Sequence, residues 1–424
     1  RRQNVGARHG RGAPRGAPRR QNVGAHRGHG VHRQHAGPQN GPKQPVKTDN
    51  MVLGRPVPLY RPDDPEGYAI AGAGAVGFLG SGNFGDVWRA KKGSQPVVLK
   101  FMVNPQTRLH STGGQASPEA KKEYHNDCEV PRMIQDAVSK NQGLQPYAKH
   151  FAKCYASTAS NDPQYRNQPV YVALEDAGPG CKDLNGWVPK TLKEAPNTIN
   201  AAKMEDFAKQ LFEALALVHH VGVVHQDTKP ENIMITKAGV LWLVDFGRAN
   251  RLMKQEVVVG RTYTTCGTPD YFAPELVASQ GHTHALDWWT LGILTFELLA
   301  GHPPFEAATP MQTYAKVSKG INRVRFPKKC KDSAGLLITG LCASSPSERL
   351  PMKRGGVDNV KEHEWFRGFS WQAMADLTAK PPFVPVVKDR KDAANFSATA
   401  EDRPPLLEYV DDHSGWDADF ATSG

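Results

Sequence analysis

The order of two patterns along the chain most constrains its fold, because short strand-type runs come first and long helical runs follow. From about Val76 to Leu174 the runs VGFLG, DVWRA, PVVLKFM and PVYVAL favour strands. Between them, EAKKEYHNDCEVPRMIQDAV predicts a helix interrupted at Pro131. From Glu205 to about Phe366 broad apolar faces predict mainly helices. We therefore expect an α+β fold with a small β-rich lobe and a large helical lobe.

The positive charge of the chain is concentrated in its first 50 residues. The net charge is +11, and residues 1–50 hold nine Arg, two Lys and one Asp. This segment repeats RRQNVGA at residues 1–7 and 19–25 and has few apolar residues, so we expect it to be disordered. A solvated tail, an RNA-binding tail and an upstream translation before Met51 are alternative interpretations. The Pro-rich residues 51–75 read as a linker.

Six cysteines lie scattered at positions 128, 154, 181, 266, 330 and 342, with no C-x-x-C pair. This spacing favours reduced thiols over a disulfide framework or a zinc site. No window of 18 uncharged apolar residues and no secretory signal pattern occur in the sequence, so we expect no transmembrane helix and a cytoplasmic protein, with the nucleus as an alternative.

A glycine-rich loop, GSGNFGDV at residues 80–87, lies between two strand patterns. On its own it is also compatible with a tight turn. A position between strands favours a hairpin that covers phosphates over a dinucleotide-binding fold. Gly80, Gly82 and Gly85 would let the backbone approach phosphate oxygens closely.

The run VVLK places a lysine, Lys100, at the end of an apolar strand that follows the glycine loop. Such a lysine can simply end a strand, but after this loop we expect it to bind the α- and β-phosphates of a nucleotide. It then needs an acidic partner. We expect Glu129, followed by Val130 and Met133 on one helical face, to be that partner, with Glu123 as the alternative.

The stretch HQDTKPEN holds an acid, a lysine and an asparagine at close spacing. Asp227 can orient an attacking hydroxyl and accept its proton, Lys229 can neutralise charge on a transferred phosphoryl group, and Asn232 can bind a metal ion. The run LVDFG follows and places Asp245 after a buried strand, where it can bridge Mg²⁺ to phosphates. Together these residues predict phosphoryl transfer with ATP and Mg²⁺ as cofactors.

Residues 76–366, with these motifs in order, resemble the eukaryotic protein-kinase domain. The runs RTYTTCGTPDYFAPE and DWWTLGILTFELLAGHPPF are similar to the branch of cyclic-nucleotide-dependent (AGC) Ser/Thr kinases, and the catalytic domain of cGMP-dependent kinases is the nearest match. The resemblance implies a bilobal fold with an N-lobe at 76–175, a C-lobe at 178–366, and a C-terminal tail at 367–424 that wraps the N-lobe. DDHSGWDADF resembles the end of such a tail, so Trp416 and Phe420 are expected to dock beside the first helix.

The resemblance also implies roles for individual residues. Nucleotide-binding positions are Leu79, Gly80, Gly82, Gly85, Val87, Val98, Lys100, Glu129, Leu174, Glu175, Ala177, Asp245 and Phe396, and the metal ligands are Asn232 and Asp245. Substrate-binding positions are Glu231, Thr268 and Glu297, where Thr268 is expected to bond Asp227 and Lys229. Structural positions are Glu275 paired with Arg349, and Asp287 holding the catalytic-loop backbone. The two substrate-binding acids imply target sites preceded by Arg or Lys. Cys181 replaces a third such acid, with Asp183 nearby.

The chain departs from the family at the residues that would bind the phosphate of the activation segment. Thr264 matches the phosphosite, but the three residues expected around the phosphate are Gln226, Asn250 and His125, two neutral amides and one weak cation. Arg251 is adjacent, but we expect its side chain to point away. We therefore expect an active kinase that depends only weakly on Thr264 phosphorylation.

Two other function classes stay open at this point. A pseudokinase scaffold would lack one of the chemical residues, and all are present. An RNA-associated protein would use the basic tail, which a salt-dependent binding assay with and without residues 1–50 would detect. No cyclic-nucleotide-binding domain occurs in this sequence, so we expect any cGMP sensor to lie on another chain.

Overall fold

The structure is a computed structural model of the 424-residue chain. The chain divides into two compact units, Arg1–Val46 and Lys47–Gly424. The structure describes residues 51–52, 55–56, 68–70, 78–81, 85–102, 111–167, 169–178, 181–185, 201–254, 257–258, 268–378 and 381. The predictions for residues 1–50 and for the C-terminal aromatic residues lie outside these ranges.

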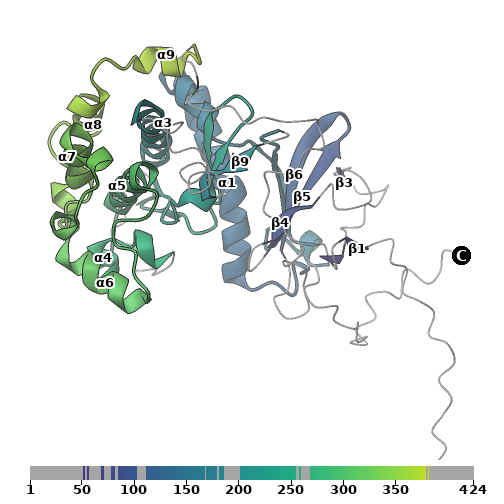
Figure 1. Cartoon of the computed structure of the whole chain (residues 1–424). Coiled ribbons are helices and arrows are strands. Elements are labelled where there is room, and N and C mark those ends of the chain that lie inside the picture. The colour runs from purple at the N-terminus through teal and green to yellow at the C-terminus, as the bar shows by residue number, and fades with distance from the viewer. Residues whose placement is uncertain are drawn as a thin grey trace, which may run out of the picture. The chain divides into compact units, whose positions relative to one another are not determined.

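An antiparallel sheet of six strands forms the first part of this unit (Figure 1). The strand order is β3-β5-β6-β8-β7, and β4 pairs with β5. The strands are β3 (Tyr68–Ile70), β4 (Phe78–Ser81), β5 (Gly85–Lys92), β6 (Gln95–Met102), β7 (Cys154–Ser157) and β8 (Tyr171–Glu175). Two small hairpins lie apart from this sheet, β1 (Met51–Val52) with β2 (Arg55–Pro56), and β14 (Met253–Lys254) with β15 (Val257–Val258).

Strands β5 and β6 separate a core face from a functional face. Trp88 and Leu99 are cross-strand partners and both are buried in one hydrophobic cluster. Val87 and Lys100 are the adjacent partners, and because side chains alternate along a strand they project from the opposite face. The hairpin turns at Gly93, whose φ of 59° is a conformation that glycine adopts readily. The strand pattern therefore presents Lys100 away from the core.

Helix α1 (Pro118–Lys140) packs against β7 and β8. It begins at Ser117, whose hydroxyl accepts the N–H of Ala120, and Pro118 occupies its first turn. The predicted interruption at Pro131 is wrong, because the helix is 23 residues long and runs through this position. Pro131 is buried together with neighbouring apolar residues of the helix, and this packing offsets the backbone hydrogen bond that proline cannot donate.

A disulfide joins Cys128 of α1 to Cys154 of β7. The expectation of reduced thiols is therefore wrong for this pair. The other described cysteines, Cys181, Cys330 and Cys342, are free and buried. No local pattern indicates this bond, because the two positions meet only when the helix packs on the sheet.

Helices dominate the second part (Figure 1). They are α3 (Ala201–His220), α4 (Pro274–Val277), α5 (Ala285–Ala300), α6 (Pro310–Lys319), α7 (Asp332–Leu341), α8 (Asp358–Lys361) and α9 (Trp371–Ala375). Helix α5 packs against both α3 and α7 and is buried along almost its whole length, which explains its near-continuous apolar sequence. It ends at Gly301, whose φ of 88° closes the helix.

Short elements complete this part. The 3₁₀ helices are η2 (Gln142–His150), η3 (Pro163–Tyr165), η4 (Pro230–Asn232), η5 (Pro269–Tyr271), η6 (Ile321–Arg323), η7 (Lys328–Cys330), η8 (Pro346–Glu348), η9 (Leu350–Met352) and η10 (Glu364–Phe366). The short strands are β9 (Lys182–Asp183), β10 (Val223–Val224), β11 (Ile233–Ile235), β12 (Leu241–Leu243) and β13 (Asn250–Arg251). Strands β9, β11 and β12 form one small sheet, and β10 pairs with β13. These two pairings hold the polar loop 225–232 next to the segment that follows β12.

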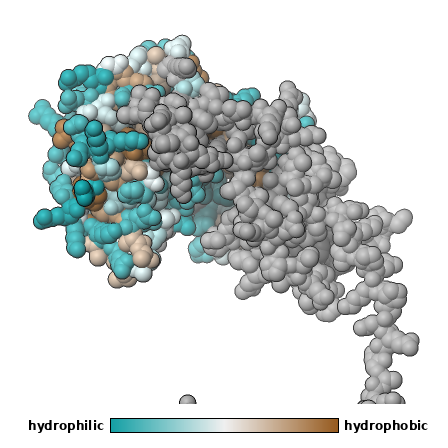
Figure 2. All heavy atoms as spheres, in the orientation of Figure 1, coloured by the Kyte–Doolittle hydropathy of each residue, from teal (hydrophilic) through white to brown (hydrophobic). Residues whose placement is uncertain are grey.

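The visible face of the helical part is mostly hydrophilic, with apolar residues scattered among the polar ones (Figure 2). Large exposed apolar residues among those described are Met311, Leu336 and Leu377. Among the described helices, none has the length and apolar character needed to cross a membrane.

Candidate active site

The loop 225–232 connects β10 to β11 and is held from below by Asp287 of α5. The Asp287 carboxylate accepts the backbone N–H groups of His225 at 2.8 Å and Gln226 at 3.0 Å. His219 of α3 lies 2.7 Å from the same carboxylate. Burial alone would raise the pKa of Asp287, but the hydrogen bond and charge of His219 lower it below its ordinary value. Asp287 therefore stays ionised and fixes the loop backbone, the role that the resemblance implied.

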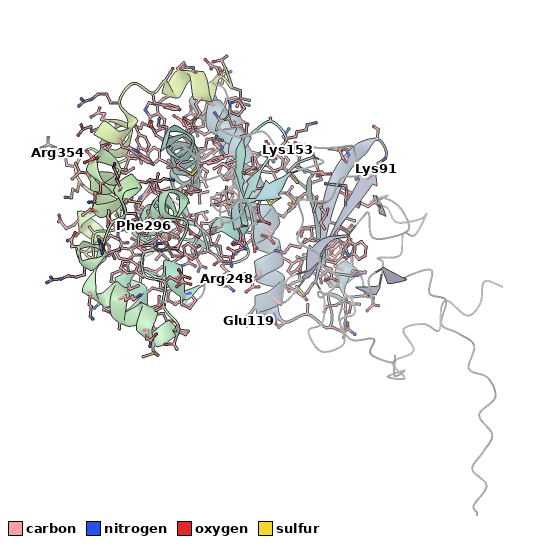
Figure 3. All side chains as sticks on the ribbon, in the orientation of Figure 1. Lys91, Glu119, Lys153, Arg248, Phe296 and Arg354 are labelled. Carbon is pink, nitrogen blue, oxygen red and sulfur yellow. A yellow bond between two sulfur atoms is a disulfide. The ribbon has the colours of Figure 1, made fainter. Side chains whose placement is uncertain are left out.

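Three polar side chains converge within this loop. The Asn232 Nδ2 donates to the Asp227 carbonyl oxygen at 2.7 Å and to its Oδ2 at 3.1 Å. The Lys229 Nζ lies 3.3 Å from the same Oδ2. Arg248, labelled in Figure 3 close to α1, adds a second cation 3.8 Å from Asp227. The Asp227 carboxylate is thus positioned by an amide and flanked by two positive charges.

Asp245 follows β12 and adopts a φ of 62°, a left-handed conformation that is uncommon for residues other than glycine and that clusters at functional sites. The backbone N–H of Val244, just before it, donates to the carbonyl oxygen of Asn232 at 3.0 Å. The positive charge of Lys100, 3.0 Å away, lowers the pKa of Asp245 to about 2. The two predicted metal ligands, Asn232 and Asp245, therefore belong to adjacent, hydrogen-bonded segments.

Lys100 connects the sheet both to α1 and to the segment that follows β12. Its Nζ lies 2.7 Å from Asp127 Oδ2 of α1 and 3.0 Å from Asp245 Oδ1. Burial favours the neutral amine, but the two carboxylates outweigh burial and raise the pKa of Lys100 well above its ordinary value. The lysine therefore stays charged and is poised where three elements meet.

The acid that pairs with Lys100 is Asp127, and the prediction of Glu129 is wrong. Each residue of an α-helix turns the side chain by 100°, so a residue two positions later points almost to the opposite side. Asp127 is 3% exposed, whereas the Glu129 carboxylate lies 2.6 Å from Arg251 in β13. The alternative Glu123 lies one turn before Asp127, near Gly247 and Asp245.

Asp127 could have been found from the burial pattern of the helix. The buried residues of α1 include Tyr124, Val130 and Ile134, and positions three or four apart lie on one face. Asp127 is three residues from Tyr124 and from Val130, so it belongs to that face. The prediction of Glu129 rested instead on Val130 and Met133, which follow it on one helical face.

Several of the predicted nucleotide-binding residues lie on strands β4 and β5. Leu79 is buried, and Gly80 pairs with Val87 across the two strands. Only glycine fits at position 85, because a Cβ there would lie 2.0 Å from the Tyr124 hydroxyl and 2.9 Å from a backbone oxygen. The remaining glycine of the loop, Gly82, lies outside the described residues.

The remaining nucleotide positions lie along β6 and β8. Val98 and Leu174 are cross-strand partners. The backbone N–H of Lys153 donates to the Glu175 carboxylate at 3.1 Å, and Ala177 follows at the end of the described segment. The predicted contact of Phe396 with a nucleotide lies outside the described residues and stays a prediction.

The residues predicted around a phosphate contact each other directly. The Asn250 Nδ2 donates to the Gln226 Oε1 at 2.8 Å, and the Gln226 amide also contacts His282. The third predicted member, His125, is exposed, and its side chain makes no hydrogen bond with any described residue. Lys122 of α1 lies in its place, 3.2 Å from Asn250. The two amides are therefore engaged with neighbours, and Thr264 itself lies outside the described residues.

Acidic side chains gather where a substrate is expected. Glu297 of α5 accepts the Tyr271 hydroxyl at 2.8 Å, and Glu231 is exposed at the end of the catalytic loop. Burial raises the pKa of Glu297 to about 7; the Tyr271 hydrogen bond opposes this effect, and neighbouring carboxylates including Glu231 add to it. Cys181, at the third family position, is buried and free, so it supplies no charge there.

Thr268 does not make the predicted bonds. It lines a small cavity together with Asp227, but among the described residues no hydrogen bond joins it to Asp227 or Lys229. Thr268 precedes η5, next to the segment 261–267 that the structure does not describe. Its role toward the substrate stays a prediction.

A buried ion pair anchors the segment after η5. The two guanidinium nitrogens of Arg349 lie 2.7 Å and 2.6 Å from the two carboxylate oxygens of Glu275, and Arg349 also donates to the carbonyl of Ala285 at 2.7 Å. Arg349 is fully buried. The pair is bidentate and its third bond reaches α5, so it fixes α4 to the helical core.

These features define the class of protein. The family model described as protein kinase domain matches residues 75–366, and the chain belongs to this family. Over 352 residues it is 44% identical to cGMP-dependent protein kinase, isozyme 1, of Drosophila melanogaster, a match that covers 81% of this chain and 40% of that protein.

Other relatives have similar names. The chain is 39% identical over 213 residues to the cGMP-dependent protein kinase egl-4 of Caenorhabditis elegans, covering 50% of this chain and 26% of that protein. It is 38% identical over 210 residues to human cGMP-dependent protein kinase 2, covering 49% and 26%. The chain therefore spans less than half the length of these relatives, and the resemblance to the cyclic-nucleotide-dependent branch holds for the catalytic domain.

Proposed function

We propose that this chain is a Ser/Thr protein kinase that transfers the γ-phosphate of Mg·ATP to protein hydroxyl groups. The observation that carries the proposal is the double contact of Lys100 with Asp127 and Asp245. A lysine from the sheet, an acid from α1 and a carboxylate from the metal-binding segment meet at one point. This arrangement supports an active enzyme over a scaffold, because a binding module has no need of it.

The donor set fits Mg²⁺ and a nucleotide. Magnesium is usually held by one or two protein oxygens together with phosphates and water, and Asp245 and Asn232 offer one carboxylate and one amide oxygen. Lys100 would bind the α- and β-phosphates, and bound Mg·ATP supplies the phosphoryl group.

The chain's own residues then act on the acceptor. Asp227 would orient the substrate hydroxyl and take its proton, while Asn232 holds the Asp227 carboxylate in place. Lys229 would neutralise the charge that develops on the transferred phosphoryl group. Because these side chains are fixed before the substrate binds, little reorganisation is needed in the transition state.

The acidic cluster supports substrates with Arg or Lys before the target residue. Glu231 and Glu297 are close enough to each other for Glu231 to raise the pKa of Glu297. Bringing a guanidinium between them would relieve this repulsion and form charge-assisted hydrogen bonds. From the names of the relatives we also propose that cGMP activates the enzyme. We further propose a cytoplasmic location.

The direct test is a radiolabelled-ATP assay on a degenerate Ser/Thr peptide library, with and without cGMP. We expect phosphorylation of peptides with Arg or Lys two to three residues before the target. A Glu231→Gln variant should lose part of that preference. A library profile that prefers acidic residues or proline at these positions would contradict the basic-substrate proposal, and no incorporation into any peptide would contradict the kinase proposal. RNA binding by residues 1–50, which we do not expect, concerns residues that the structure does not describe, and it stays an untested alternative.

A further inference from the structure

Asn126 of α1 bonds to the backbone that follows the metal-binding aspartate. Its side-chain Nδ2 donates to the carbonyl oxygen of Gly247 at 3.3 Å and to that of Ala249 at 2.8 Å. These two carbonyls lie on either side of Arg248, which faces the catalytic Asp227. One side chain of the helix therefore holds the turn that begins at Asp245.

The position of Asn126 next to Asp127 gives this contact its importance. Asp127 reaches Asp245 through Lys100, and Asn126 reaches the same segment two and four residues later. Two consecutive residues of one helix thus hold the start and the end of a five-residue segment. The segment also closes on itself, because the N–H of Ala249 donates to the carbonyl of Phe246 at 2.9 Å.

Two further contacts join α1 to the residues that follow this segment. Lys122, one turn before Asn126, donates to Asn250 at 3.2 Å, and Glu129 pairs with Arg251 at 2.6 Å. Both of these involve exposed side chains, so each contributes little by itself. Asn126 is half-buried and bonds to two main-chain oxygens, which makes it the contact that defines where the backbone lies.

We propose that Asn126 is a positioning residue for phosphoryl transfer: by holding the carbonyls of Gly247 and Ala249, it sets the position of the Asp245 carboxylate relative to Asp227 and Asn232. It does not touch the reacting atoms. The proposal rests on the proposed kinase function for its kinetic consequence, but its structural part, the ordering of residues 245–251 by α1, stands independently.

The test compares Asn126→Ala and Asn126→Asp with a matched control, Asn359→Asp. The Asn359 Nδ2 also donates to two backbone carbonyls, those of Leu350 at 2.9 Å and Arg354 at 3.1 Å, far from the site in sequence and outside the catalytic residues. Both aspartate variants lose the same type of double hydrogen bond. A purely structural role therefore predicts similar losses of thermal stability and similar, small effects on activity.

If Asn126 positions Asp245, its variants should lower kcat by about tenfold to thirtyfold, the effect of two hydrogen bonds of ordinary strength, with the KM for peptide unchanged. They should also need more Mg²⁺ for half-maximal activity, and Asn359→Asp should show neither change. Equal kcat values and equal Mg²⁺ dependence for the Asn126 and Asn359 variants, with the wild type active, would overturn the proposal.

Hydrogen exchange separates this inference from the proposed function. In Asn126→Ala the backbone amides of residues 245–251 should exchange faster than in the wild type, whether or not the protein phosphorylates a substrate, whereas Asn359→Asp should leave them unchanged. Unchanged exchange in Asn126→Ala would overturn the inference. An inactive wild type with the expected exchange pattern would instead overturn the kinase proposal alone.

Discussion

Replacing Asp127 by Asn tests which acid holds the lysine of the sheet. The Asp127 carboxylate is 3% exposed and lies 2.7 Å from the Lys100 Nζ. Breaking a buried ion pair by removing one partner costs about 3–5 kcal/mol. The lysine is 24% exposed and keeps Asp245 at 3.0 Å, so solvent and the second carboxylate compensate part of this cost. We expect the free energy of unfolding to fall by about 2–3 kcal/mol.

The assay is steady-state phosphorylation of an Arg-containing Ser peptide at varied ATP. The pair also holds Lys100 for the nucleotide, so kcat/KM for ATP should fall as well, by about 30-fold to 150-fold if all of this energy is lost from the transition state. The control is Glu129→Gln, which removes only the pair with Arg251, whose side chains are 33% and 48% exposed. Exposed pairs contribute at most about 1 kcal/mol, so this variant should lose less than about fivefold.

The order of the two effects decides the assignment. A greater loss in Glu129→Gln than in Asp127→Asn would refute the reasoning and restore Glu129 as the partner of Lys100. Melting temperatures of both variants serve as the folding control, since a variant that is unfolded at the assay temperature gives no information on the pair. Asp127→Glu keeps the charge and should recover part of the activity.

Three further predictions follow from the site. Thr264→Ala should change kcat/KM by less than about tenfold, because Gln226 offers a neutral amide where a phosphate would need a cation; a hundredfold loss in a folded variant would contradict this. Burial raises the pKa of Glu297 to about 7, so its charge is lost as the pH falls below 7. The KM for an Arg-containing peptide should therefore rise severalfold from about pH 8 to pH 6. A peptide without basic residues should show no such rise. Arg349→Gln leaves Glu275 as a buried charge without its partner, so the free energy of unfolding in urea should fall by about 3–5 kcal/mol, and an unchanged denaturation midpoint would show that the pair does not stabilise the fold.

The arrangement of the polypeptide followed from local patterns in the sequence. Alternation in β5 and β6 predicted both strands, and it places Lys100 opposite the buried Leu99 face. The near-continuous apolar run of α5 predicted a buried helix, and Gly301 marked its end. Asp227 was predictable from the close spacing of an acid, a lysine and an asparagine, and Asp245 from its place after a short buried strand.

The errors concern contacts across the helix α1. The identity of the acid that pairs with Lys100 depends on how α1 is rotated relative to the sheet, and neither Glu129 nor the alternative Glu123 could be tested against that rotation from the sequence. The helix runs through Pro131 because its surroundings bury it, and local propensity cannot include that packing. The disulfide and the bonds of Asn126 join residues that are distant in sequence, so no local pattern announces them.

The central claim, that this chain catalyses phosphoryl transfer with Asp227 as the residue that orients the acceptor, is tested most directly by one comparison. Wild-type protein and Asp227→Asn are incubated with Mg²⁺, γ-labelled ATP and an Arg-containing Ser peptide, and nucleotide affinity is measured separately by calorimetry. We predict label transfer by the wild type, a loss of at least about a hundredfold in kcat for the variant, and equal ATP affinity for both, because the carboxylate acts in the transition state more than in nucleotide binding. Equal turnover by the two proteins, or no label transfer by the wild type, would contradict the claim.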